Sequence, residues 1–226
     1  MLLLLACTTP SPHTGLDTGV DSGEPIPFEE LYAVVYLDGR GDVDGRSTRA
    51  SHWVSRGSLP VLEPGDCTSR YATITDGPWY SAGEVQVSLD GEPLESTVSG
   101  WPGGSAMTVR STGDDIPAFQ LEEPITVPPW VDLQVQVEEQ PHGASLKVSW
   151  TPTEQGLLVV RLSHRTDPES SDIDTCVFPA SAGQAEVLAD DAVFLWEVDY
   201  VTETHLPAPP TQGVLIRTQS GVSDLL

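Results

Sequence analysis

The chain has 226 residues and carries 10 Lys and Arg against 34 Asp and Glu, which gives a formal net charge of −24. This acidic excess repels phosphate, so it excludes nucleic-acid binding through a basic face and membrane attachment through a basic patch. Gly and Pro number 20 each, which makes the chain rich in turns but not disordered by composition. The sequence holds no run of about 18 apolar residues, so we expect no membrane-spanning helix.

The first residues of the chain, MLLLLACT, form a short apolar segment that ends at a cysteine. Leu4, Leu5, Ala6 and Cys7 resemble the lipobox of bacterial lipoproteins. That resemblance implies a diacylglycerol on the Cys7 sulfur, cleavage of the chain before Cys7 and anchoring of the protein to a membrane through lipid. In that family, a residue other than Asp at the position of Thr8 implies the outer membrane. The alternative is a chance apolar segment with a core cysteine.

Residues 1–6 are shorter than a complete secretory signal and lack its basic residues, so we interpret them as a partial signal peptide. Residues 7–27 then combine the lipidated Cys7 with a stretch rich in Thr, Ser, Pro, Gly and Asp. Such a segment buries too little apolar surface to offset the entropy of ordering it. We therefore expect a flexible acidic linker between the membrane and the folded part of the protein.

Short apolar runs, most of them alternating with polar residues, fill the rest of the chain and are separated by Gly and Pro. Such runs predict β-strands, here at Leu31–Leu37, Tyr71–Thr75, Glu84–Leu89, Met107–Arg110, Val131–Val137, Ser145–Trp150, Leu157–Leu162, Ala185–Leu188, Phe194–Val201 and Val214–Thr218. Pairs such as Asp38-Gly39 and Asp90-Gly91 predict turns, and Glu186–Phe194 is expected to include one short helical turn. The pattern predicts an all-β fold, an antiparallel β-sandwich of immunoglobulin-like type, as one sandwich or two tightly joined ones.

We divide the folded part into an N-terminal β region, residues 28–128, and a C-terminal β-sandwich, residues 129–226. The second part begins with PPWVDLQVQV, ASLKVSWTP and GLLVVRL, which resemble the first three strands of a fibronectin type III or immunoglobulin-like module. The matching residues are Leu133, Val135 and Val137, then Leu146, Val148 and Trp150, then Val159 and Arg161. The resemblance implies that Trp150 lies in the core between the two sheets, and Tyr200 is a candidate for the tyrosine that such modules carry late in the chain.

A further resemblance concerns the region from Ala82 to Ala180, which is similar to uncharacterised exported lipoproteins of Gram-negative bacteria. The pieces that carry it are AGEVQVS, GDDIPAF, SWTP and CVFPA. It implies a location in the bacterial cell envelope and an all-β architecture, and it implies no activity.

The chain has three cysteines, Cys7, Cys67 and Cys176. If Cys7 carries lipid, two remain, and an exported compartment favours their oxidation to a disulfide. That bond would close a loop of about 110 residues and stabilise the fold by about 4 kcal/mol. The alternative is two separate buried thiols.

The densest acidic segment runs from Asp38 to Gly45 and could bind Ca²⁺ through Asp38, Asp42 and Asp44. It departs from the EF-hand pattern, because Arg40 occupies the first Asp position and Ser51 the last Glu position. We therefore favour a polar hairpin loop between two strands, with no metal. The same segment contains the tripeptide Arg-Gly-Asp, which we attribute to chance.

Several aromatic residues lie in or beside turns, and these are candidates for stacking on sugar rings: Trp79, Tyr80, Trp101 and Trp130. The favoured alternative is that these side chains fill the core or cap the ends of the sandwich.

Signals for catalysis are weak. Four histidines outside the linker, His52, His142, His164 and His205, are scattered, and the sequence contains no HExxH, GxSxG or phosphate-binding loop. We therefore expect no catalytic residues and no cofactor. The chain is interpreted as a membrane-anchored exported lipoprotein with a non-catalytic β-sandwich that binds an envelope protein or a surface glycan. The alternative is a carbohydrate-binding module or an exported glycan hydrolase, and the sequence does not define the oligomeric state.

Overall fold

The computed structural model describes residues 27–40, 47–59, 61–65, 67–72, 80–94, 103–128, 131–165, 171–189 and 193–225. The regular secondary structure of this part is β-strand, apart from two 3-10 turns, η1 (Phe28–Glu30) and η2 (Ala180–Ala182). Within it, no helix has the length and apolar character needed to cross a membrane. The lipobox and the linker expected at residues 7–27 lie outside the described residues, except for Pro27.

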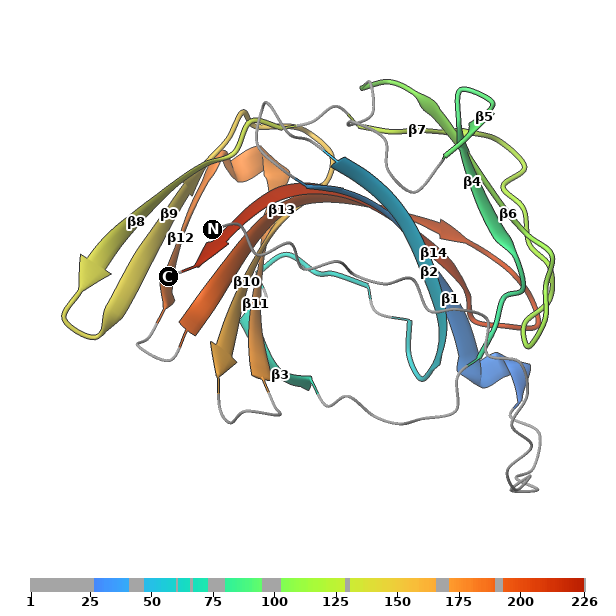
Figure 1. Ribbon diagram of the computed structural model, residues 1–226, viewed down its shortest axis with the longest axis horizontal. Helices are drawn as coiled ribbons and strands as arrows, with labels where there is room; N and C mark the ends of the chain where they lie inside the picture. Colours follow the sequence, from blue (N-terminus) through green and yellow to red (C-terminus); the bar gives the residue numbers. More distant parts are fainter. Residues whose placement is uncertain are drawn as a thin grey trace, which may run out of the picture.

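Seven strands form one long sheet in the order β2-β1-β14-β13-β10-β11-β3. In chain order they are β1 (Leu31–Arg40), β2 (Ser47–Arg56), β3 (Cys67–Ala72), β10 (Leu157–Arg165), β11 (Ser171–Pro179), β13 (Val193–Leu206) and β14 (Gly213–Leu225). All neighbours are antiparallel except β1 and β14, which run parallel. The sheet is bent into an arch (Figure 1).

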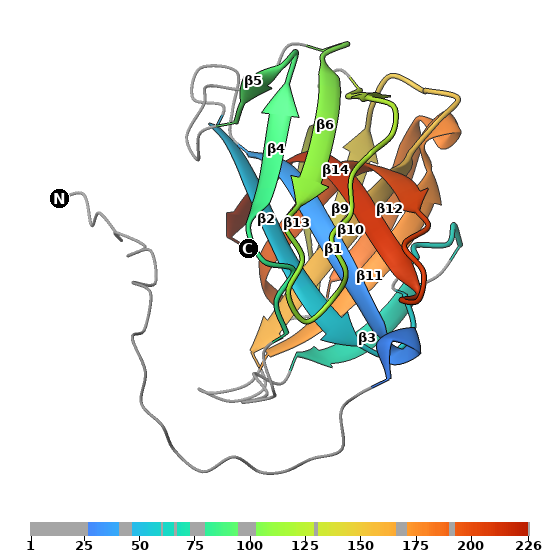
Figure 2. The ribbon, with the colours of Figure 1, turned by 90° about the vertical axis from the view of Figure 1, so that its right-hand side faces the viewer.

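Two small sheets lie on the outer side of this arch (Figure 1). One has the order β12-β9-β8 and consists of β8 (Gln134–Gln140), β9 (Gly143–Ser149) and β12 (Gln184–Ala189). The other has the order β5-β4-β6-β7 and consists of β4 (Val85–Leu89), β5 (Glu92–Pro93), β6 (Ala106–Ser111) and β7 (Ile125–Thr126). Figure 2 shows β4 and β6 in front of β1 and β2. The molecule is thus two β-sandwiches that share one long sheet.

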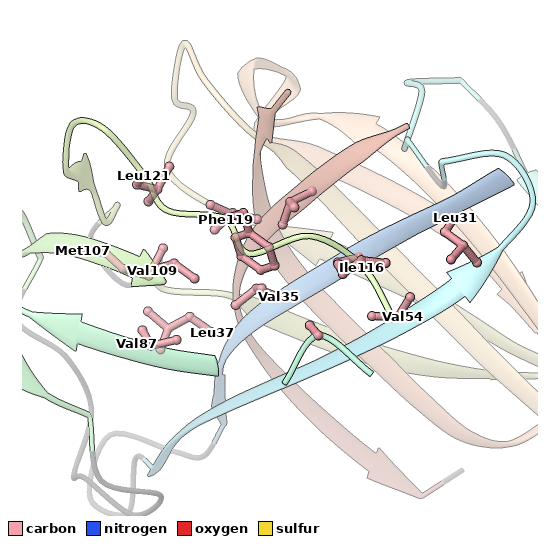
Figure 3. Close-up of a cluster of buried hydrophobic side chains, with 14 of the residues drawn as sticks. Leu31, Val35, Leu37, Val54, Val87, Met107, Val109, Ile116, Phe119 and Leu121 are labelled. Atoms are coloured by element: carbon pink, nitrogen blue, oxygen red, sulfur yellow. The ribbon is translucent and has the colours of Figure 1, made fainter. Parts of the chain in front are cut away.

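Side-chain alternation shows that both sandwich cores use the same face of the shared sheet. In β14, Val214 and Ile216 belong to the core under β4 and β6, and Val222 packs against the core under β9 and β12. These positions differ by even numbers, so all three side chains point outward from the arch. Figure 3 shows the first core, where Val35 and Leu37 of β1 face the residues contributed by the small sheet.

The second core belongs to an immunoglobulin-like sandwich made by residues 131–225. Its first, second and fifth strands (β8, β9 and β12) form one sheet, and its third, sixth and seventh (β10, β13 and β14) form the other, as in immunoglobulin domains. The fourth strand, β11, pairs with the third. Trp150 is buried in this core and its indole Nε1 donates to the carbonyl of Ala180 at 2.7 Å, so the core position implied by the sequence resemblance is confirmed.

The predicted pairing of Cys67 with Cys176 is present. The two residues lie opposite each other on β3 and β11 and form a disulfide that spans 109 residues of sequence. Cys176 is buried in the second core. Because β3 forms the edge of the long sheet, the bond fixes an edge strand to its neighbour.

Most predicted strands are confirmed, but their boundaries differ, and the two-residue strands β5 and β7 and two long strands escaped prediction. Strands β2 and β11 have the sequences STRASHWVSR and SDIDTCVFP, which are too polar to stand out from turns. The helical turn expected from Glu186 is wrong for the described residues, because Glu186–Ala189 belong to β12. Asp38-Gly39 also lies inside β1 rather than in a turn, since the hairpin to β2 turns further along the chain.

Strands β4 to β7 of one small sheet precede residue 128, where the sequence suggested a division, and β8, β9 and β12 of the other follow it. The long sheet nevertheless takes strands from both sides of that point, because β1 and β2 continue it beyond β14 and β3 continues it beyond β11. The two sequence regions therefore do not fold as separate bodies.

We predict that replacing both cysteines (Cys67→Ala with Cys176→Ala) lowers the free energy of unfolding by about 2–5 kcal/mol, since the unfolded chain loses a long covalent loop. Urea unfolding without reductant measures the change. Wild-type protein in reductant should show a similar loss, which separates the bond from the side chains. An unchanged midpoint in both samples would contradict a stabilising role for the disulfide.

Candidate functional site

The outer face of the shared sheet carries a polar strip between its two cores. Along β13 the outward side chains are Trp196 and Val198 under one small sheet and Leu206 under the other. Between them lie Tyr200, Thr202 and Thr204, on the same face by alternation. The apolar face of each strand is thus interrupted where no small sheet covers it.

A groove of about 790 Å³ lies over this strip. Its floor is β13 from Tyr200 to Thr204, and its two walls come from the β7 region and from the connection between β9 and β10. The wall residues are Gly104, Thr126, Val127, Pro128, Thr153, Glu154, Gln155, Gly156 and Leu157. The volume falls within the usual range of ligand pockets, and the lining is rich in hydroxyl groups.

The floor of the groove is held in place by two contacts. The Tyr200 hydroxyl donates to the carbonyl oxygen of Gln155 at 2.9 Å, and the hydroxyls of Thr202 and Thr218 lie 2.5 Å apart. Gly156 has a φ of +89°, and a Cβ there would lie 2.8 Å from the Tyr200 ring. The wall can therefore approach the floor only because residue 156 is glycine.

The inner face of the arch carries a layer of buried charged side chains. Arg217 is 4% exposed and forms an ion pair with Glu203 of the neighbouring strand. One strand further on, Arg161 pairs with Asp199, whose side chain is fully buried. A charged side chain loses hydration free energy when it is buried. The attraction within each ion pair offsets part of that loss.

The connection from β2 to β3 crosses this inner face from one edge of the sheet to the other (Figure 1). The amide of Leu62 donates to Glu203 Oε2 at 3.3 Å, and the amide of Leu59 donates to the Gln212 side chain at 3.1 Å. Leu59 also packs against the inner apolar cluster of Tyr32, Val34 and Leu215. The connection therefore shields part of the charged layer from solvent.

An aromatic pair lies on the inner face near the β2 edge. The rings of Tyr36 and Trp53 are stacked, with centroids 4.5 Å apart and planes inclined by 24°. The Tyr36 hydroxyl accepts a hydrogen bond from Arg217 Nη1 at 2.6 Å, so the pair is connected to the buried Arg217–Glu203 ion pair. Trp53 itself is 42% exposed.

A smaller hollow of about 430 Å³ lies on the face of β8, β9 and β12 that points away from the core, with Gln136, Lys147 and Glu186 among its lining residues. Lys147 Nζ lies 2.7 Å from Glu138 Oε2, and this hydrogen bond raises the pKa of Lys147. Both side chains are close to half exposed, so water screens the pair and it contributes little to stability.

Of the three metal ligands suggested by the sequence, the structure describes Asp38 alone. Asp38 lies on the inner face of β1 and accepts a hydrogen bond from Gln219 Nε2 at 3.0 Å. Asp42 and Asp44 lie outside the described residues. The described residues contain no group of three or more His, Cys, Asp or Glu side chains arranged to hold a metal ion.

Of the four aromatic candidates for sugar stacking, the structure describes Tyr80. Its side chain is partly buried and packs against the first core, and its backbone bridges to Val54, so it agrees with the core alternative. Trp79, Trp101 and Trp130 lie outside the described residues, as does the lipidation candidate Cys7.

Sequence reasoning missed the Tyr36–Trp53 pair. In the sequence Tyr36 stands within an apolar run that predicts a buried strand, and Trp53 lies in a strand too polar to be predicted. The signal is the register of the hairpin. Tyr36 lies opposite Ser51 and Val34 lies opposite Trp53, so Tyr36 and Trp53 share a face and become diagonal neighbours once β2 is recognised.

Histidines stay apart in the described structure. His164 Nε2 lies 2.9 Å from Asp174 Oδ2, and His142 lies in the exposed turn between β8 and β9. His52 points to the outer face of β2, opposite Val35, and burial of part of its ring lowers its pKa from 6.5.

We predict that Gly156→Ala destabilises the fold more than Gly91→Ala. Both glycines have positive φ values, +89° and +86°, but a Cβ at residue 91 would have no neighbour within 4 Å. The backbone cost is therefore common to both, and the clash with Tyr200 adds about 1–3 kcal/mol. The difference between the urea midpoints of the two variants measures this effect. Equal midpoints would mean that the groove wall moves to accommodate the Cβ with no loss of stability.

We also predict that stability falls as the pH drops through 6.5, because the unfolded chain protonates His52 at a higher pH than the folded protein does. His52→Gln should weaken this dependence, measured as the change in urea midpoint between pH 7.5 and pH 5.5. His142→Gln, which removes an exposed imidazole, is the control. A wild-type pH dependence in the His52→Gln variant would contradict the assignment.

Comparison with known proteins adds no family to this description. No protein-family model matches the chain, and no curated protein sequence matches it. The candidate sites therefore depend on the contacts of this chain alone.

Proposed function

We propose that the protein is exported, anchored to the outer membrane of a bacterial cell envelope through a lipid on Cys7, and binds a component of that envelope through its double sandwich. The observation that carries the proposal is the disulfide between Cys67 and Cys176. Disulfides persist in oxidising compartments outside the cytosol. With these two cysteines paired, the third is Cys7, which stands at the acceptor position of the lipobox-like Leu4–Cys7 segment.

The shape of the body supports a binding role. The two sandwiches share β13 and β14, so the floor of the groove between them lies on a strand that contributes side chains to both cores. The stacked Tyr36–Trp53 pair is likewise held by residues of several strands. Surfaces built on rigid strands bind with a smaller loss of conformational entropy than surfaces on loops.

The acidic composition supports attachment by lipid rather than by charge. With a formal net charge of −24, the chain is repelled by anionic membrane surfaces. Acyl chains bind through apolar burial, about 0.8 kcal/mol for each CH₂ group, and do not depend on protein charge.

We predict that the wild-type chain is labelled in bacterial cells by a clickable palmitate analogue and fractionates with membranes, and that Cys7→Ser is neither labelled nor retained. Cys176→Ala is the matched control: it removes a cysteine elsewhere and should still be labelled. Equal labelling of wild type and Cys7→Ser, or release of the wild-type chain without detergent, would refute the anchor.

A further inference from the structure

Trp53 is a large aromatic side chain left open to solvent on the shared sheet. Where the structure describes exposure, the exposed large apolar residues of that sheet are Trp53, 42% exposed, and Leu225, 72% exposed, at the far end of β14. Trp53 lies on the edge strand β2 and points to the inner face, since it pairs with Val34 of the inner cluster. Among the strands of the shared sheet it is therefore a single exposed ring, and the adjoining segments add the exposed side chains of Phe28 in η1 and Val61 in the connection to β3.

The ring of Trp53 is fixed from behind. One of its faces stacks on Tyr36, whose hydroxyl accepts from Arg217 at 2.6 Å. Arg217 is in turn buried and paired with Glu203, whose other carboxylate oxygen accepts from the amide of Leu62. A chain of contacts thus runs from the exposed indole into the buried charged layer, so a ligand that stacks on the indole need not immobilise it first.

Polar groups flank the ring along the same face of β2. By strand alternation Ser51 and Ser55 share that face with Trp53, and both are half-buried. Arg49, two residues before Ser51 in the chain, is exposed on the same face. An apolar ring between hydroxyl and charged side chains matches a pyranose, which has an apolar C–H face and a rim of hydroxyl groups.

The surroundings distinguish among possible ligands. The buried centre of a protein–protein interface is more apolar than the surface in general, whereas the strand residues that flank Trp53 are polar. A polyanion would be repelled by the net charge of −24. We therefore propose that the face of β2 around Trp53 binds a neutral glycan, with one sugar ring stacked on the indole. This assignment rests on the proposed function, because it names the ligand class that the exported body would bind.

The test compares two substitutions of Trp53, one that removes the aromatic ring and one that keeps an aromatic ring. Trp53→Leu keeps apolar bulk in the strand but removes the aromatic face, whereas Trp53→Tyr keeps an aromatic face. Full-length purified proteins are run in native gels that contain one of three neutral polysaccharides: a soluble β-1,3-glucan, hydroxyethyl cellulose or glycol chitin. We expect at least one to retard the wild type, Trp53→Leu to bind it at least about tenfold more weakly, and Trp53→Tyr to retain most of the binding.

Two controls identify the surface. Leu188→Ala removes an exposed apolar side chain from β12, the edge strand of a small sheet, and Thr126→Ala alters the wall of the outer groove. Both should bind as the wild type does. The proposal is overturned if none of the three polysaccharides retards the wild type, if Trp53→Leu binds normally, or if Thr126→Ala loses binding while Trp53→Leu keeps it. Palmitate labelling is independent of all these results, so failure of glycan binding and failure of the lipid anchor are told apart.

Discussion

The fold depends on one constraint: β13 and β14 must each serve two hydrophobic cores with a single outward face. Both strands meet it with an apolar–polar–apolar sequence on that face, Val214 and Ile216 at one end of β14 and Val222 at the other, with Thr218 and Ser220 between. Each apolar end packs against one small sheet. The polar middle leaves the gap that becomes the outer groove, so the groove follows from the same pattern that holds the sandwiches together.

The inner face differs in the kind of side chain that it buries, because neither of the two small sheets covers it. Its buried side chains are charged or hydroxyl-bearing as well as apolar, and the ion pairs Arg217–Glu203 and Arg161–Asp199 join adjacent strands across the bend. The connection between β2 and β3 crosses over them, and the disulfide at Cys67 fixes its far end to the opposite edge of the sheet. Burial of charge is here compatible with stability because both members of each pair are fixed on strands.

The proposed glycan surface is a consequence of this inner layer. Exposing the apolar surface of a tryptophan to water is unfavourable in free energy. On a mobile segment such a side chain would pack against other apolar groups. Here Tyr36 and Arg217 hold Trp53 in a defined orientation, with polar neighbours along the strand. The features that point to export and lipid attachment are the cysteines, and they are independent of the binding surface.

The sequence by itself determined the all-β class and most strand positions, because alternation and turn residues are local signals. The core role of Trp150 was implied by the resemblance to fibronectin type III and immunoglobulin-like modules, and the count of three cysteines made Cys67 and Cys176 the candidate partners. The sequence could not reveal β2 and β11, whose residues are too polar to show the alternation. The tertiary structure decided the parallel pairing of β1 with β14, which joins the two regions into one sheet, and the meeting of Tyr36, Trp53 and Arg217. Those contacts link residues up to 181 positions apart, and their partners become neighbours only after the strands have chosen an order and a register.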